Sequence, residues 1–69
     1  KILKDYKGAI ADYNKAIELK PNSVKSYINR GNAKSNLKDY RGAIVDFNKA
    51  IYLNPNSGDA YFFRGNAKI

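Results

Sequence analysis

The side chains best placed to bind a ligand are asparagines that lie close together in the sequence. Asn29, Asn32 and Asn36 are three and four residues apart, so a helix would place them on one face with Lys25 and Ile28. An asparagine amide has two donor hydrogens and an acceptor oxygen, so it can hold a peptide backbone whatever the peptide sequence. We interpret Asn32 and Asn66, which lie 34 residues apart, as candidate peptide contacts. The alternative is ordinary surface polarity that recurs because the sequence is duplicated.

Residues suited to catalysis or metal binding are scarce. The chain has no His and no Cys, and its six Asp and Glu residues are dispersed. A nucleophile beside a base, a pair of catalytic carboxylates and a zinc site all need residues that this sequence lacks or separates. No glycine-rich phosphate loop is present either. We therefore predict no enzyme activity, no catalytic residues, no metal site and no cofactor.

Length and charge limit the class of protein and its partners. A chain of 69 residues forms at most one small domain. Thirteen Lys and Arg against six Asp and Glu give a net charge of +7, which favours an acidic protein, a nucleic acid or an anionic surface; the alternative is a solvated basic surface. The apolar runs are too short to cross a membrane. Without cysteine the compartment stays undecided, and the cytoplasm is only a default.

The sequence repeats itself at a fixed interval. When residues 1–35 are laid on residues 35–69, a shift of 34, 22 of the 35 pairs are identical, whereas chance would give about two or three. The matched segments are Leu3–Tyr6 with Leu37–Tyr40, Gly8–Ile10 with Gly42–Ile44, Asn14–Ile17 with Asn48–Ile51, Pro21–Ser23 with Pro55–Ser57, and Arg30–Lys34 with Arg64–Lys68. This identity indicates duplicated structural units.

Each unit is predicted to contain two helices. Apolar residues after Tyr40 recur at spacings of three and four, which is typical of one helical face. Asp39 and Ser57 precede helical segments and are predicted N-caps, and Pro55 ends the helix before it. We predict an all-α chain with helices at 5–20, 24–37, 39–53 and 58–69, turns near 4–5, 21–23, 38–39 and 54–57, and no strands.

Small residues mark where the helices should cross. Gly31 lies inside a predicted helix, where glycine costs about 1 kcal/mol relative to alanine, and close approach of a neighbouring helix would compensate for that cost. We predict that Gly31 and Ala43 lie close to the place where two antiparallel helices cross. The residues predicted to be mostly buried are Tyr27, Gly31, Ala43, Phe47 and Ala50.

These residues resemble the tetratricopeptide repeat family, whose repeat unit carries the pattern W-x2-L-G-x2-Y, A-x3-F, A and P at the same period. The corresponding residues here are Tyr27-x2-Arg30-Gly31-x2-Lys34, Ala43-x3-Phe47, Ala50 and Pro55. The resemblance implies antiparallel helix pairs stacked in an α-solenoid, a right-handed superhelix. It divides the single domain 1–69 into a partial repeat at 1–23, a complete repeat at 24–57 and a partial repeat at 58–69.

Two departures from the family pattern recur with the repeat. Arg30 and Arg64 stand where the pattern has leucine, and Lys34 and Lys68 stand where it has tyrosine. Because aspartates recur with the same period, at positions 12 and 46, we predict that the two arginines pair with these aspartates between helices. The alternative is a solvated arginine.

The resemblance also implies a binding site, because the first helix of each pair lines a concave groove that holds a protein or peptide. The residues that map to this groove are Lys25, Ile28, Asn29, Asn32, Asn36, Asp59, Phe62, Phe63 and Asn66. Some relatives clamp the carboxylates of chaperone tails, but Ile28 and Phe62 occupy positions where a clamp lysine is expected. Exposed apolar clusters mark interfaces, so Phe62 and Phe63 are the aromatic residues that we favour as partner contacts.

The remaining aromatic residues bear on a second function. Aromatic side chains among lysines can stack on nucleic acid bases, and helical repeats that bind RNA exist. However, repeat position predicts a packing role for Tyr6, Tyr13, Tyr27, Tyr40, Phe47 and Tyr61. We therefore favour a protein-interaction scaffold and keep a basic repeat that binds nucleic acid as the alternative.

The phase of the repeat predicts self-association. The chain begins at Lys1–Leu3, late in a first helix, and ends at Ile69 inside another, so we expect a fragment of a longer array with an uncovered helix face at each end. Repeat units are stabilised by their neighbours. Two copies are therefore expected to dock head to tail, burying Tyr61, Gly65 and Ile69 against Tyr6, Ile10 and Tyr13.

Overall fold

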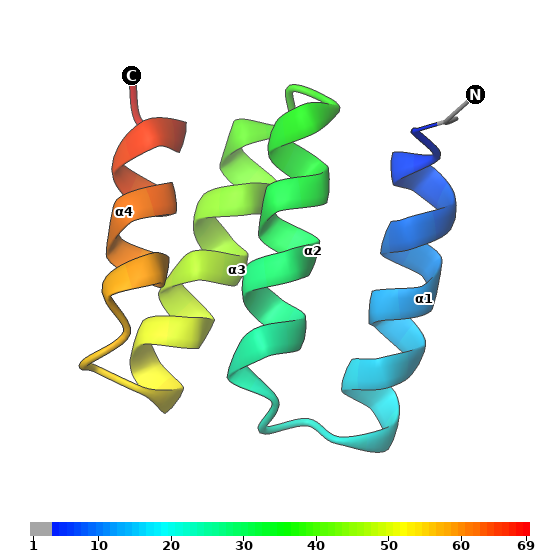
Figure 1. Cartoon of the computed structure of the whole chain (residues 1–69), viewed down its shortest axis with the longest axis horizontal. Helices are drawn as coiled ribbons and strands as arrows, with labels where there is room; N and C mark the ends of the chain where they lie inside the picture. Colours follow the sequence, from blue (N-terminus) through cyan, green and yellow to red (C-terminus); the bar gives the residue numbers. More distant parts are fainter. Residues whose placement is uncertain (1–3) are drawn as a thin grey trace.

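The computed structural model describes residues 4–69, and these residues fold into a row of four helices without a strand (Figure 1). The helices are α1 (Tyr6–Leu19), α2 (Val24–Asn36), α3 (Tyr40–Leu53) and α4 (Gly58–Ala67). Helix α2 contacts each of the other three, and α3 also contacts α4. The all-α prediction is confirmed. The segment 1–3, expected to end an earlier helix, lies outside the described residues.

Five of the eight predicted helix ends are too long by one or two residues, because capping residues lie outside the helices. The starts of α2 and α4 and the end of α3 are as predicted. The Asp39 carboxylate accepts a hydrogen bond from the Gly42 N–H at 3.0 Å, which satisfies a free donor of the first turn. The Asp5 carboxylate likewise accepts a hydrogen bond from the Gly8 N–H at 2.9 Å, at the start of α1. The hydroxyl of Ser57 caps α4, so both predicted caps are confirmed.

The caps also explain why glycine recurs early in α1 and α3. A Cβ atom built on Gly42 would lie 2.3 Å from Oδ2 of Asp39, and one on Gly8 would lie 2.1 Å from Oδ2 of Asp5. A side chain there would displace the carboxylate from its capping position. Glycine therefore leaves room for the cap.

Helix α2 ends in a tight reversal that leads directly into α3. The Asp39 N–H donates to the carbonyl oxygen of Lys34 at 2.8 Å, and the Lys38 N–H donates to that of Ser35 at 2.9 Å. These two hydrogen bonds form a Schellman motif, in which the residue that follows the end of the helix adopts the left-handed conformation. Lys38 adopts that conformation with φ of 65°, where glycine is the usual residue.

The core lies between α2, α3 and α4 in two adjoining clusters. Tyr27 packs with Ala50 and Ala60, and Phe47 packs with Ala43 and Ala67. The side chains of Ala43, Phe47 and Ala50 are fully buried, as predicted. These alanines let the helices approach closely enough for the Phe47 ring to fill the space between them.

The predicted close crossing at Gly31 is confirmed. A Cβ atom built on Gly31 would lie 2.6 Å from Cε1 of Phe47. The Phe47 ring therefore lies against the backbone of α2, in space that any side chain at position 31 would occupy. Close contact between this ring and Gly31 compensates for the low helix propensity of glycine.

The prediction that all repeat-position aromatic residues are core packing is wrong for several of them. Tyr27 and Phe47 are buried, but Tyr40 and Tyr61 are 47% and 45% exposed, and Tyr6 and Tyr13 are half-buried. The reason is that a repeat position is buried only where helices lie on both sides of it. The α2–α3 pair has such neighbours among the described residues, whereas α1 and α4 are covered on one side.

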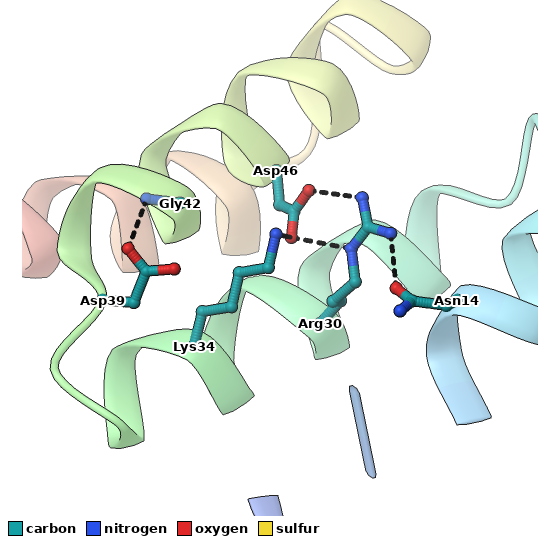
Figure 2. Close-up of polar contacts among 6 residues, drawn as sticks. All are labelled: Asn14, Arg30, Lys34, Asp39, Gly42 and Asp46. Carbon is teal, nitrogen blue, oxygen red and sulfur yellow. Dashed lines mark hydrogen bonds and ion pairs between the residues drawn. The ribbon is translucent and has the colours of Figure 1, made fainter. Parts of the chain in front are cut away.

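A buried carboxylate joins α2 to α3 (Figure 2). Arg30 donates from Nε to Oδ2 of Asp46 at 2.9 Å and from a terminal nitrogen to Oδ1 at 2.7 Å. The ammonium of Lys34 lies 3.1 Å from the same carboxylate. The second terminal nitrogen of Arg30 donates to Oδ1 of Asn14 on α1 at 2.8 Å. One guanidinium therefore links three helices.

The environment of Arg30 favours its charged form. The hydrogen bond to Asp46 raises the pKa of Arg30 above its ordinary value and outweighs the lowering effect of burial. A raised arginine pKa keeps the guanidinium protonated as pH rises, so its half of the ion pair persists at every pH at which proteins ordinarily fold.

The prediction that each arginine pairs with an aspartate is right for Arg30 and wrong for Arg64. Arg64 donates to Oδ1 of Asn48 at 2.8 Å, which repeats the contact between Arg30 and Asn14. Asp12 is exposed and forms no ion pair within residues 4–69. The cause is orientation: α1 presents Asn14 to α2, and the face that carries Asp12 points elsewhere.

Candidate functional site

Three adjoining hollows lie along α2, and Asn32 lines all of them. Their volumes are about 450, 400 and 500 Å³. They extend over α2 toward α1 on one side and α4 on the other. Eight of the nine predicted groove residues line these hollows: Lys25, Ile28, Asn29, Asn32, Asn36, Asp59, Phe63 and Asn66.

The hollow between α1 and α2 is walled by tyrosines. Tyr6 and Tyr13 face Asn29, Asn32 and Asn36 across it. The sequence predicts a packing role for both tyrosines, and neither is among the predicted site residues. Tyr40 is equivalent to Tyr6 in the next repeat and lines the next hollow. The recurrence of tyrosine at this repeat position is therefore the sequence feature that points to the walls of the hollows.

The hollows between α2 and α4 share one aromatic wall. Phe63 lines both of them, with Asn66 in one and Asp59 in the other. The Phe63 ring stacks on the buried Phe47, with 6.1 Å between their centroids. Its position is therefore set by the core, which makes it a rigid surface for a bound chain.

The asparagines differ in how much hydrogen-bonding capacity they keep. The Asn36 amide donates to the carbonyl oxygen of Asn32 in its own helix at 3.0 Å. The amides of Asn29, Asn32 and Asn66 make no side-chain hydrogen bond to the rest of residues 4–69. These three amides line the hollows with their donors and acceptors available to a ligand.

Two apolar residues of the predicted site differ from the rest. Phe62 is 64% exposed and lines none of the three hollows; it packs edge-on against Phe63, with 5.4 Å between the ring centroids. Ile28 is half-buried and packs against both core clusters. It therefore supports the floor of the site as well as lining it.

Charged residues around the hollows are few and of both signs. Lys25 and Asp59 line the same hollow, and Lys4 and Asp5 line the one beside α1. Most of the net charge of +7 thus lies on other surfaces. In the part of the chain that the structure describes, no His, Cys, Asp or Glu residues form a group of metal-binding size, and no helix has the length and apolar character needed to cross a membrane.

Comparison with known families agrees with the helical pairs and the spacing of their repeat. A family model described as "Tetratricopeptide repeat" matches residues 24–57, and one described as "TPR repeat" matches residues 2–38. No curated protein matches the chain. Tetratricopeptide repeats are generally modules for protein–protein interaction rather than enzymes. From the helical repeat and these two matches, the chain belongs to the tetratricopeptide repeat family.

Proposed function

We propose that the chain binds an extended segment of a partner protein along the hollows over α2 and α4. The observation that carries this proposal is the run of adjoining hollows lined by asparagine amides that have no partner within residues 4–69. Asn32 and Asn66 occupy equivalent positions of the repeat, on α2 and α4. They would therefore present the same amide to a peptide backbone twice along its length.

The chemistry of the hollows favours backbone recognition with one apolar anchor. Each amide can donate to a peptide carbonyl and accept from a peptide N–H. Phe63 offers a fixed ring against which an apolar side chain of the partner can pack. An extended peptide would leave alternate side chains in solvent, so its sequence would be restricted mainly at the anchor.

The net charge of the chain favours an acidic partner. A charge of +7 raises the association rate with a negatively charged protein through long-range attraction. Because few of the charges line the hollows, the attraction would act mainly on the rate of encounter. Higher salt is then expected to slow association and change dissociation little.

The test begins with selection of random peptides, each about 12 residues long to match an extended segment, displayed on phage. Enriched peptides are then labelled and titrated in fluorescence anisotropy. Replacing Asn32 or Asn66 with alanine removes one or two hydrogen bonds and should weaken binding by about tenfold. The matched control is Asn22→Ala, an exposed asparagine in the turn after α1, which should leave binding unchanged. Equal loss of binding in N22A and N32A would contradict the proposed site.

The same titration with random-sequence RNA tests the alternative function. A basic surface that binds RNA loses affinity steeply as salt rises. If RNA binds more tightly than any enriched peptide and N32A does not weaken it, the nucleic acid function replaces the peptide function. The exposed pair of Lys49 and Tyr52, with the ammonium 5.2 Å from the ring centroid, would then be the first place to mutate.

A further inference from the structure

The hollow of about 500 Å³ between α2 and α4 has opposite charges on its two helices. Lys25 lines this hollow from α2, and Asp59 lines it from α4. Both residues are exposed. Neither forms an ion pair with another residue in the range 4–69, so both charges are available to a bound chain.

The adjoining hollow between the same two helices carries no charge. Its lining residues are Asn32, Ser35, Asn36, Tyr40, Phe63, Asn66 and Ala67. Phe63 belongs to both hollows. The surface over α2 and α4 therefore has a charged end, near the start of both helices, and a neutral end that follows it.

The two charges occupy equivalent positions of the repeat. Lys25 and Asp59 are 34 residues apart, and each is the second residue of its helix. Asn32 and Asn66 are also 34 residues apart. Because their amides are identical, amide contacts alone would hold a given stretch of peptide backbone on either helix. The reversed charge is what distinguishes α2 from α4 for a bound segment.

Helix stability does not explain the lysine. The first turn of a helix carries a partial positive charge, which favours an acidic side chain and disfavours a basic one. Asp59 gains from this effect in α4, whereas Lys25 occupies the same turn of α2 and loses by it. No ion pair within residues 4–69 compensates Lys25. Contact with an acidic group of a ligand would provide that compensation.

We propose that this hollow binds a segment with one acidic and one basic residue, the acid at Lys25 and the base at Asp59. The inference rests on the proposed function, since it takes the segment to lie over α2 and α4. Packed helices lie about 8–10 Å apart, and an extended chain advances about 3.3 Å per residue. The two charged residues are therefore about two to four residues apart.

An apolar residue of the segment fits between the two charges. Ile28 and Phe63 line the same hollow as Lys25 and Asp59. Phe63 stacks on the buried Phe47 and Ile28 packs against the core, so the floor of the hollow is both apolar and fixed. The charges on either side of this floor determine which helix each half of the segment crosses.

The probe for this inference is the tightest peptide from the phage selection, with its amino end acetylated and its carboxyl end amidated so that neither carries charge. We expect its sequence to contain an acid and a base on either side of an apolar residue. Two further peptides replace the acid or the base with glutamine. Fluorescence anisotropy then measures the affinity of each peptide for the wild-type chain, Lys25→Gln and Asp59→Asn.

Double-mutant cycles show which charges meet. Lys25→Gln should weaken the original peptide about threefold and leave unchanged the affinity for the peptide that lacks the acid. Asp59→Asn should behave in the same way toward the base. The crossed pairs, Lys25 with the base and Asp59 with the acid, should show little coupling. Because exposed ion pairs are screened by salt, the matched couplings should vanish at about 1 M salt.

Matched controls separate these contacts from a change in net charge. Lys49→Gln removes the same charge from an exposed residue of α3, and Asp12→Asn removes an exposed acid of α1. Neither residue lines any of the three hollows. Both variants should show no coupling to either peptide charge. Circular dichroism verifies that every variant keeps its helices.

The Asn32→Ala variant distinguishes failure of this inference from failure of the proposed function. If N32A weakens the peptide but K25Q and D59N show no matched coupling, the segment binds over α2 and the charge assignment is wrong. A tightest peptide that lacks either charge also overturns the assignment. If N32A, K25Q and D59N all bind the peptide as the wild type does, the proposed function fails together with this inference.

Discussion

Asp46 is a charged residue at a core position, 1% exposed, and its environment shows why that is tolerated. A buried carboxylate is costly unless it is paired and hydrogen-bonded. Here Arg30 binds both oxygens and Lys34 adds a second positive charge. The arginine and lysine that depart from the family pattern and the buried aspartate form one cluster and depend on one another.

Removing Asp46 should therefore destabilise the fold strongly. Asp46→Ala leaves two cations with little access to water, and the free energy of unfolding should fall by about 3 kcal/mol. Asp12→Ala is the matched control, since it changes the equivalent residue where it is exposed; its effect should stay within about 0.5 kcal/mol. Urea unfolding at low micromolar concentration measures both. Equal effects of the two substitutions would contradict the role assigned to Asp46.

Gly31 and Gly65 offer a second matched comparison. Alanine is the better helix former by about 1 kcal/mol, so Gly65→Ala should raise the free energy of unfolding. At Gly31 the added methyl group meets the Phe47 ring, and overpacking should lower the free energy by about 1–3 kcal/mol. Thermal unfolding by circular dichroism gives the sign of each change. A stabilised G31A variant would show that the Phe47 ring can move aside.

At the scale of the helix, the end of α2 is the element under strain. Lys38 has φ of 65°, a conformation that costs residues with a side chain about 1 kcal/mol or more. Lys38→Gly should therefore increase the free energy of unfolding by about 0.5–1 kcal/mol without adding a contact. Lys20→Gly is the control at the end of α1. The φ of Lys20 is −137°, so glycine should not increase the free energy of unfolding there. If both variants lose stability equally, relief of strain is not the cause.

At the scale of the whole molecule, burial is unequal along the row of helices. In α1, all of which the structure describes, no residue is buried, whereas α2 and α3 contain three and four. Stability in repeat arrays comes from contacts between neighbouring units, so a helix with less burial should open more often.

Hydrogen exchange measures this difference directly. We expect amides in the middle of α3 to exchange at least about tenfold more slowly than those in the middle of α1. The measurement belongs at low micromolar concentration, so that association does not protect α1. Equal protection of α1 and α3 would mean that the described residues unfold as one cooperative unit.

Much of this architecture is determined by the sequence alone. The period of 34, the apolar spacing and Pro55 predict four helices, and Asp39 and Ser57 predict their starts, because these signals act between residues close in the chain. The core around Phe47 and the crossing at Gly31 also follow, since a duplicated pattern places equivalent residues at equivalent contacts. The groove face of α2 is predicted by the family resemblance, and helical spacing agrees with it because the residues concerned share one face of the helix.

Other features were decided only by the tertiary structure. Arg30 and Arg64 are equivalent in the repeat, and so are Asp12 and Asp46. Within residues 4–69 only Arg30 and Asp46 meet, because a neighbouring helix must bring the charges together. The tyrosines share a repeat position, yet Tyr27 is buried and Tyr61 is not. A repeat makes residues equivalent in sequence, but burial and pairing depend on which helices lie beside them in space.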